Sequence, residues 1–136
     1  MDSSADVVWQ WLIHARKWPE YYSNSSNVQY ENESGPILKS DTVFRWKTFD
    51  VSLISEVKEY VENERIAWTG KGFGLDVYHA WLIMPNGKGG CIVRTEEVQH
   101  GFVSRLGKLF FPSRMHAQHQ HWLEQLAIQS KTGKPT

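Results

Sequence analysis

The chain has 136 residues, and its 15 Lys and Arg balance its 15 Asp and Glu to a formal net charge of zero. This length suits a single domain with its own core, and the balanced charge excludes a strongly basic chain of the kind that binds nucleic acid. The single cysteine, Cys91, excludes an internal disulfide, and the lack of a membrane-length apolar run or a basic leader predicts a cytoplasmic protein without stable membrane insertion.

Two helices are predicted near the N-terminus. Ser3 or Ser4 is a suitable N-cap for a helix over Ala5–His14, in which apolar residues recur at helical spacing. Pro19 then ends this helix and opens a short helical turn that closes near Tyr22, because a residue before proline disfavours the α region. A polar stretch follows and leads into the middle of the chain.

Strand-like segments joined by short turns fill that middle part. Such a series favours an antiparallel sheet of sequential strands over parallel crossovers. The segments are Val28–Glu31, Thr42–Phe49, Val51–Val61, Arg65–Gly70, Val77–Met84 and Cys91–Gln99.

Helical periodicity returns after Gly101. An apolar segment over residues 102–111 is interrupted by Pro112, and Ser113 is a suitable cap for a long C-terminal helix. Apolar and histidine side chains fall on one face of this helix and can be buried against the sheet. They are Met115, His119, Trp122, Leu123 and Leu126.

The segment Leu75–Gly101 is the most informative part of the chain, because it sets polar groups into an apolar face. If its loop covers Asn86–Gly90, strand alternation places His79 directly opposite Glu97. Trp81 lies on the same face as this pair. A histidine and a carboxylate side by side among apolar residues predict a pocket.

The pair of His79 and Glu97 has three interpretations. In an enzyme the carboxylate would orient the imidazole and raise its pKa, so that the pair works as a general acid–base catalyst. In a binding protein the two groups would anchor and orient a ligand in an apolar pocket. In a protein without a ligand they would be a self-satisfied polar contact. The residues alone leave these three interpretations open.

The histidines of the last third raise the question of a metal. They are His100, His116, His119 and His121. Zinc sites usually show a clearer ligand set along the sequence than these histidines do. We therefore predict no metal and no cofactor, and we expect His119 to be a polar group on the helix face that looks into the pocket.

Several strings along the chain, in their order, resemble the START-like, helix-grip superfamily, which includes the polyketide cyclase/dehydrase and lipid-transport group (SRPBCC). The strings are Ala5-Asp6-Val7-Val8-Trp9, Trp18-Pro19, Phe44-Arg45-Trp46, Arg65-Ile66-Ala67-Trp68, Tyr78-His79-Ala80-Trp81, Thr95-Glu96-Glu97 and His119-Gln120-His121-Trp122-Leu123. The resemblance implies an α+β fold in which a curved antiparallel sheet wraps around a long C-terminal helix. It covers one domain over residues 1–130, and we expect residues 131–136 to form a disordered tail.

One feature of the superfamily is missing here. Its members begin with a strand that precedes the first helix and pairs with the last strand, whereas at most five residues precede the helical pattern of this chain. Without that strand, Cys91–Gln99 would lie at an unpaired sheet edge. Exposed edges invite pairing with another chain, so we predict a homodimer through this edge, or a frayed edge.

The resemblance also implies a function. In this superfamily the sheet and the long helix enclose a cavity for hydrophobic small molecules, so we expect binding or transport of a hydrophobic, ring-containing molecule. The alternative is an enzyme similar to polyketide aromatase/cyclases or dehydrases, in which His79 or Glu97 moves a proton. The residues expected to contact the ligand are Phe44, Trp46, Trp68, His79, Trp81, Val93, Thr95, Glu97, Met115, His119 and Trp122.

Overall fold

The computed structural model describes residues 1–72, 74–100 and 112–135, except for the side chains of residues 100 and 112–116. Three short helical elements come first: α1 (Ala5–Ile13), a 3₁₀ turn (Ala15–Lys17) and α2 (Trp18–Tyr21). The strands and the last helix are β1 (Ser25–Tyr30), β2 (Val43–Thr48), β3 (Val51–Val61), β4 (Arg65–Gly72), β5 (Leu75–Pro85), β6 (Cys91–His100) and α4 (Pro112–Ser130). None of the helices in these described ranges is long and apolar enough to cross a membrane.

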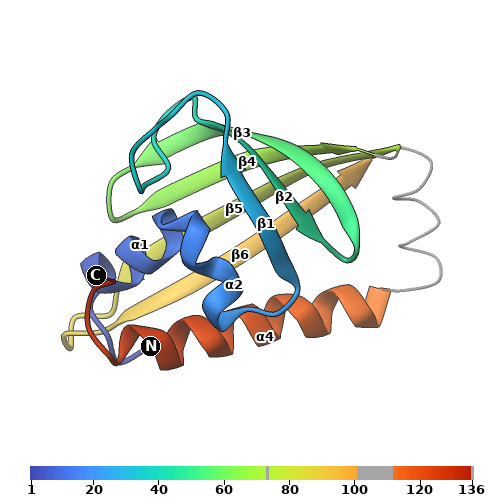
Figure 1. The fold of residues 1–136 in the computed structure, drawn as a ribbon. Helices are drawn as coiled ribbons and strands as arrows, with labels where there is room; N and C mark the ends of the chain where they lie inside the picture. Colours follow the sequence, from blue (N-terminus) through green and yellow to red (C-terminus); the bar gives the residue numbers. More distant parts are fainter. Residues whose placement is uncertain (73, 101–111, 136) are drawn as a thin grey trace.

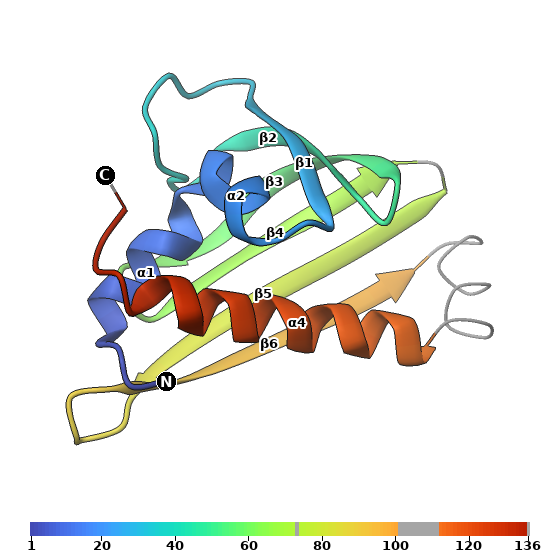
Figure 2. The same ribbon diagram turned by 60° about the horizontal axis from the view of Figure 1, so that its bottom comes forward.

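The strands form one antiparallel sheet in the sequential order β1-β2-β3-β4-β5-β6 (Figure 1). The sheet curves, and α4 runs along its concave side beside the long strands β5 and β6 (Figure 2). The short helices α1 and α2 also contact α4. The predicted α+β class is confirmed, with a curved antiparallel sheet, a C-terminal helix and short helices near the N-terminus.

The register of the β5–β6 hairpin is the one that the sequence predicts. Pro85 pairs with Cys91 at the turn, and His79 pairs with Glu97 in the middle of the strands. Residues with odd numbers in β5 therefore face the concave side, and Val77, His79 and Trp81 are all buried. The hairpin thus carries its polar pair into the space beneath α4.

Aromatic rings fill most of that space. Trp122 of α4 lies against several rings from the rest of the fold, with ring centroids 4.6 Å from Tyr22, 4.9 Å from Trp81 and 5.1 Å from Trp18. Trp18 in turn contacts Phe44 and two further tryptophans of the sheet. Ring pairs at these distances are stabilising beyond the apolar area that they bury. We refer to this group as the ring cluster; its members are Trp18, Tyr22, Phe44, Trp46, Trp68, Trp81 and Trp122.

One strand differs from the sequence prediction in where it begins. Strand β1 begins at Ser25 rather than Val28, because a register shift at Asn27, whose φ is 54°, lets the strand continue through polar residues. Beyond α4, the indole Nε1 of Trp11 donates a hydrogen bond to the carbonyl oxygen of Gly133 at 2.6 Å. Gly133 therefore contacts α1, and the disordered tail expected over residues 131–136 stays a prediction. The predicted helix over residues 102–111 lies outside the described residues.

Strand β6 stands last in the sheet order of the described residues. Its first residue exchanges two hydrogen bonds with the N-terminal residue: the Met1 amino group donates to the Cys91 carbonyl at 2.6 Å, and the Cys91 N–H donates to the Met1 carbonyl at 2.9 Å. This exchange is the pattern of an antiparallel pair. The described chain thus begins to pair with β6 at Cys91.

The side chain of Cys91, at the site of this pairing, is fully buried. Burial raises the pKa of its thiol, since desolvation disfavours the thiolate, although the nearby N-terminal ammonium works in the opposite direction.

At pH 8 the thiol of Cys91 in the folded protein should react with a disulfide reagent about a hundredfold more slowly than in the urea-unfolded chain. This is the factor expected if the reaction needs a local opening that costs roughly 3 kcal/mol. The rate should rise with pH, because more thiolate forms. Cys91→Ser controls for the signal, and folded protein reacting as fast as the unfolded chain would contradict the burial.

Candidate functional site

A small cavity lies between the concave face of the sheet and α4. Its enclosed volume is about 20 Å³, and it is partly open to solvent. A space of that size holds about one water molecule or one small ion, far less than a typical ligand pocket of several hundred cubic ångströms. The lining residues are Tyr22, Trp46, Thr48, Phe49, Leu53, Ser55, Trp68, Gly70, Val77, His79, Glu97, His119 and Trp122.

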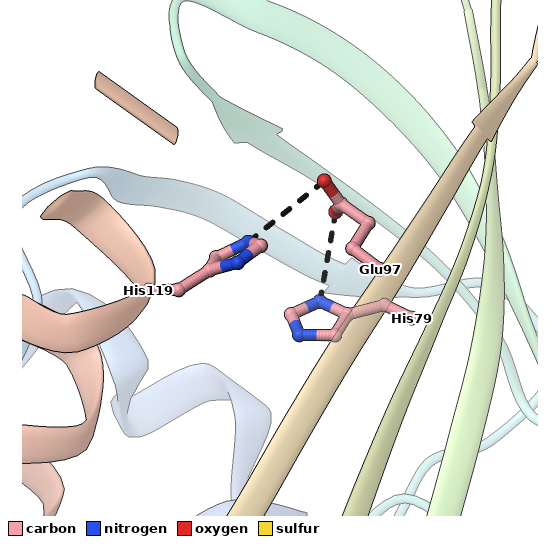
Figure 3. A group of neighbouring side chains, drawn as sticks. All are labelled: His79, Glu97 and His119. Atoms are coloured by element: carbon pink, nitrogen blue, oxygen red, sulfur yellow. Dashed lines mark ion pairs between the residues drawn. The ribbon is translucent and has the colours of Figure 1, made fainter. Parts of the chain in front are cut away.

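Three titratable side chains from three different elements meet at this cavity (Figure 3). His79 comes from β5, Glu97 from β6 and His119 from α4. The Nδ1 atom of His79 lies 3.8 Å from Oε1 of Glu97, and Nε2 of His119 lies 3.8 Å from Oε2 of the same carboxylate. The two imidazole ring centroids are 5.1 Å apart. We call these three residues the His–Glu–His cluster.

The ring cluster holds the two histidines in place. Trp81 stacks on the His79 ring with centroids 5.2 Å apart, and Trp122 contacts the same ring edge-on at 5.8 Å. His119 lies one helical turn before Trp122 on the same face of α4, so the docking of Trp122 turns His119 toward the sheet. The register of the β5–β6 hairpin places His79 next to Glu97, and the packing of α4 against the sheet places His119 beside them.

The tautomer of His79 follows from its hydrogen bonds. Its Nε2 lies 2.7 Å from Oγ1 of Thr95, and the Thr95 hydroxyl donates its proton to the carbonyl oxygen of Ala80 at 3.2 Å. When the hydroxyl gives its one proton to Ala80, it accepts from His79, and Nε2 is then the protonated nitrogen. The Nδ1 lone pair of the neutral ring therefore faces the Glu97 carboxylate.

Burial keeps the His79 ring neutral. Its side chain is 3% exposed, and desolvation lowers its pKa well below the usual value, with a smaller contribution from the neighbouring His119. The Glu97 side chain is 13% exposed and accepts a hydrogen bond from Nε2 of Gln99 at 2.8 Å. Among the described residues that line the cavity there is no lysine or arginine to balance this carboxylate.

The opposite wall of the cavity comes from β3 and β4. The indole Nε1 of Trp46 donates to Oγ of the buried Ser55 at 3.0 Å, which fixes the plane of that ring. Gly70 keeps the space open: a Cβ atom there would lie 2.6 Å from Cγ2 of Val77. Phe49, at the turn between β2 and β3, lines the cavity from a left-handed conformation with φ of 49°, which bulky residues rarely adopt.

The structure places some of the predicted ligand contacts at the cavity and others elsewhere. Those that line it are Trp46, Trp68, His79, Glu97, His119 and Trp122. Phe44 and Trp81 lie in the ring cluster, and Val93 packs against the core. Thr95 does not line the cavity but forms a hydrogen bond with the ring of His79, which does. Met115 lies in α4, but its side chain is outside the part of the chain that the structure describes.

Sequence reasoning missed other lining residues. Tyr22, Leu53 and Ser55 all line the cavity. Leu53 and Ser55 alternate along β3, so the period of two would have found them once the buried face of that strand was assigned. Tyr22 stacks on Trp122 with an interplanar angle of 16°, a contact between distant segments that no local pattern signals.

The whole chain has a close counterpart among solved structures. Hypothetical protein jhp0584 from Helicobacter pylori is 32% identical to it with a TM-score of 0.87, covering 94% of this chain and 81% of that one. The chain belongs to the family of that protein. No family model and no curated protein matches the sequence.

A more distant structure has the same overall arrangement. Protein CV1439 from Chromobacterium violaceum is 15% identical with a TM-score of 0.64, covering 95% of this chain and 91% of that one. At this level of identity the likeness shows the fold alone. It shows the curved sheet and long helix without bearing on the His–Glu–His cluster.

The Trp46–Ser55 hydrogen bond gives a direct test of the cavity wall. Ser55→Ala leaves a buried indole N–H without its acceptor, so the free energy of unfolding should fall by about 1–3 kcal/mol. Urea unfolding followed by circular dichroism measures the change. Ser52→Ala, at an exposed position of the same strand, should have little effect. Equal stability of both variants would contradict the proposed role of the bond.

Proposed function

We propose that the protein binds or transports a hydrophobic, ring-containing small molecule, whose polar group enters the cavity beside the His–Glu–His cluster. The enclosed space is about 20 Å³, so it takes only a small polar group. The rest of the ligand lies toward the open side, against apolar and aromatic walls. This proposal takes the fold as a helix-grip domain, consistent with the curved sheet around α4.

One observation carries this proposal. Polar groups that can still accept hydrogen bonds converge on a solvent-connected cavity whose other walls are mainly aromatic and aliphatic side chains. Glu97 has oxygen lone pairs to offer, and the neutral His79 presents the lone pair of Nδ1. Ligand sites combine apolar walls with a few such convergent polar groups. Ser55, on the opposite wall, adds a hydroxyl.

The second candidate is an enzyme resembling polyketide aromatase/cyclases or dehydrases. The observation that favours it is the fixed tautomer of His79, because a neutral imidazole with an oriented lone pair suits a general base. Glu97 would then stabilise the imidazolium that forms. In this role the pair moves a proton of a bound substrate rather than only orienting it.

Native mass spectrometry of protein purified from its own host tests the binding proposal. A stoichiometric organic adduct is the expected result, and its mass gives the ligand class. The identified compound is then titrated against the protein by tryptophan fluorescence, since Trp46, Trp68 and Trp122 line the cavity. A bare chain in the spectrum, together with no fluorescence response to ring-containing carboxylates, amines or phenols, would contradict the proposal.

A matched pair of variants locates the ligand and separates the two candidates. Glu97→Gln removes the charge at the cavity and should weaken binding by about tenfold, the loss of one charge-assisted hydrogen bond. Glu96→Gln, whose side chain is 67% exposed on the same strand, should leave binding unchanged. If the protein is a carrier, the Glu97→Gln variant still binds its ligand and releases it unchanged. If the protein is an enzyme, the same variant still binds the substrate but no longer converts it. Equal affinities of the two variants would place the ligand elsewhere.

We also propose that two copies associate through the β6 edge. Support comes from the position of β6 at the end of the sheet order and from the exposed apolar residues Ile92 and Val98 on that strand. Light scattering should give twice the mass of the chain. Val98→Lys should shift the population toward monomer, because a lysine on an edge strand opposes pairing, while Val61→Lys on β3 should not. A single-chain mass at every concentration would contradict this association.

A further inference from the structure

We propose that His79, Glu97 and His119 bind a divalent transition-metal ion of the zinc class. The His–Glu–His cluster supplies two imidazole nitrogens and a carboxylate oxygen, a donor set that suits zinc and its neighbours in the first transition row. This inference does not depend on an organic ligand in the cavity, and it differs from the expectation of the sequence, which predicts no metal.

The spacing of the donor atoms fits an ion between them. One ligand atom from each residue lies within 4.8 Å of the other two, and both nitrogen–oxygen distances are 3.8 Å. Separations of this length are too long for hydrogen bonds. Two ligand atoms that are each ~2.1 Å from a tetrahedral zinc ion are ~3.4 Å apart, so a small inward movement of the side chains completes the coordination.

The charges of the cluster also favour a cation. The Nδ1 lone pair of His79 and the Glu97 carboxylate are both acceptors, and they face one another in a site where the side chains are 3% and 13% exposed. The neutral form in which burial holds His79 is the form that coordinates metals. A divalent ion between these groups would convert an unfavourable arrangement of two acceptors into a favourable one.

A second layer of hydrogen bonds orients the donors. Thr95 holds the far nitrogen of the His79 ring, and Gln99 holds one oxygen of Glu97. Such contacts are typical of metal ligands, whose remaining polar atom is usually bonded to a hydroxyl, amide or carbonyl group. This layer leaves Nδ1 of His79 as the ring atom that points at the cluster.

The adjoining cavity suits an open coordination position. Three protein ligands with a fourth position for water or substrate are the pattern of reactive zinc sites, whereas structural sites are closed by four protein ligands. The cavity beside the cluster has room for one water molecule. A ligand atom that enters the cavity therefore meets the fourth position directly.

The first test is metal binding by the full chain after EDTA treatment and removal of the chelator. Isothermal titration with Zn²⁺ should show one ion per chain, and Co²⁺ should give the visible absorption bands of a tetrahedral site. Absence of saturable one-to-one binding of Zn²⁺ by the folded wild-type chain would overturn the proposal.

Paired variants locate the ion. His119→Gln and Glu97→Gln each remove a ligand and should weaken Zn²⁺ binding by more than tenfold. His121→Gln and Glu96→Gln, which lie on the same helix and the same strand, should bind as the wild type does. Circular dichroism without metal confirms that all four variants are folded. If His121→Gln weakens binding and His119→Gln does not, the assigned site is wrong.

Thr95→Val tests the positioning layer without removing a ligand. The variant keeps the shape of the side chain but lets the His79 ring turn, so the affinity for Zn²⁺ should fall by about 10–100-fold. The Co²⁺ spectrum should also shift, a change that a purely structural role for Thr95 would not produce. Zinc binding, together with a bare chain in the mass spectrum and no fluorescence response to the organic probes, would support the metal proposal and contradict the small-molecule proposal. An organic adduct without zinc binding would support the small-molecule proposal and contradict the metal proposal.

Discussion

The position of α4 on the sheet depends above all on the insertion of Trp122 into the ring cluster. Trp122 is 2% exposed and lies against rings from α2, β2, β4 and β5, so one side chain ties the helix to most of the fold. Aromatic packing of this kind combines a large buried area with preferred ring geometry. Because His119 is one helical turn away, the same insertion determines where the third member of the His–Glu–His cluster lies.

The ring cluster also explains why the enclosed space is small. The resemblance to helix-grip proteins implies a cavity for a whole hydrophobic molecule, whereas here tryptophan and tyrosine side chains occupy most of the region between sheet and helix. What remains is the small cavity beside His79.

Local patterns predicted much of this molecule and failed at contacts between distant segments. The loop Asn86–Gly90 and the period of two were enough for the pairing of His79 with Glu97, because register in a hairpin follows from turn length. The partners of His119 were not predictable in this way. Helical spacing detects only ligands that lie on one helix, whereas this carboxylate comes from β6, and only the packing of α4 on the sheet brings it near His119.

The missing side chain of Gly70 has a consequence for the size of the cavity. Its missing side chain leaves the space bounded by Leu53, Ser55 and Val77, and even one added carbon would meet Val77 at 2.6 Å. A single substitution at position 70 would therefore reduce the volume of the cavity. In this chain a larger residue at position 70 would either displace Val77 or fill the space beside it, so the openness of the cavity depends on a side chain that is absent.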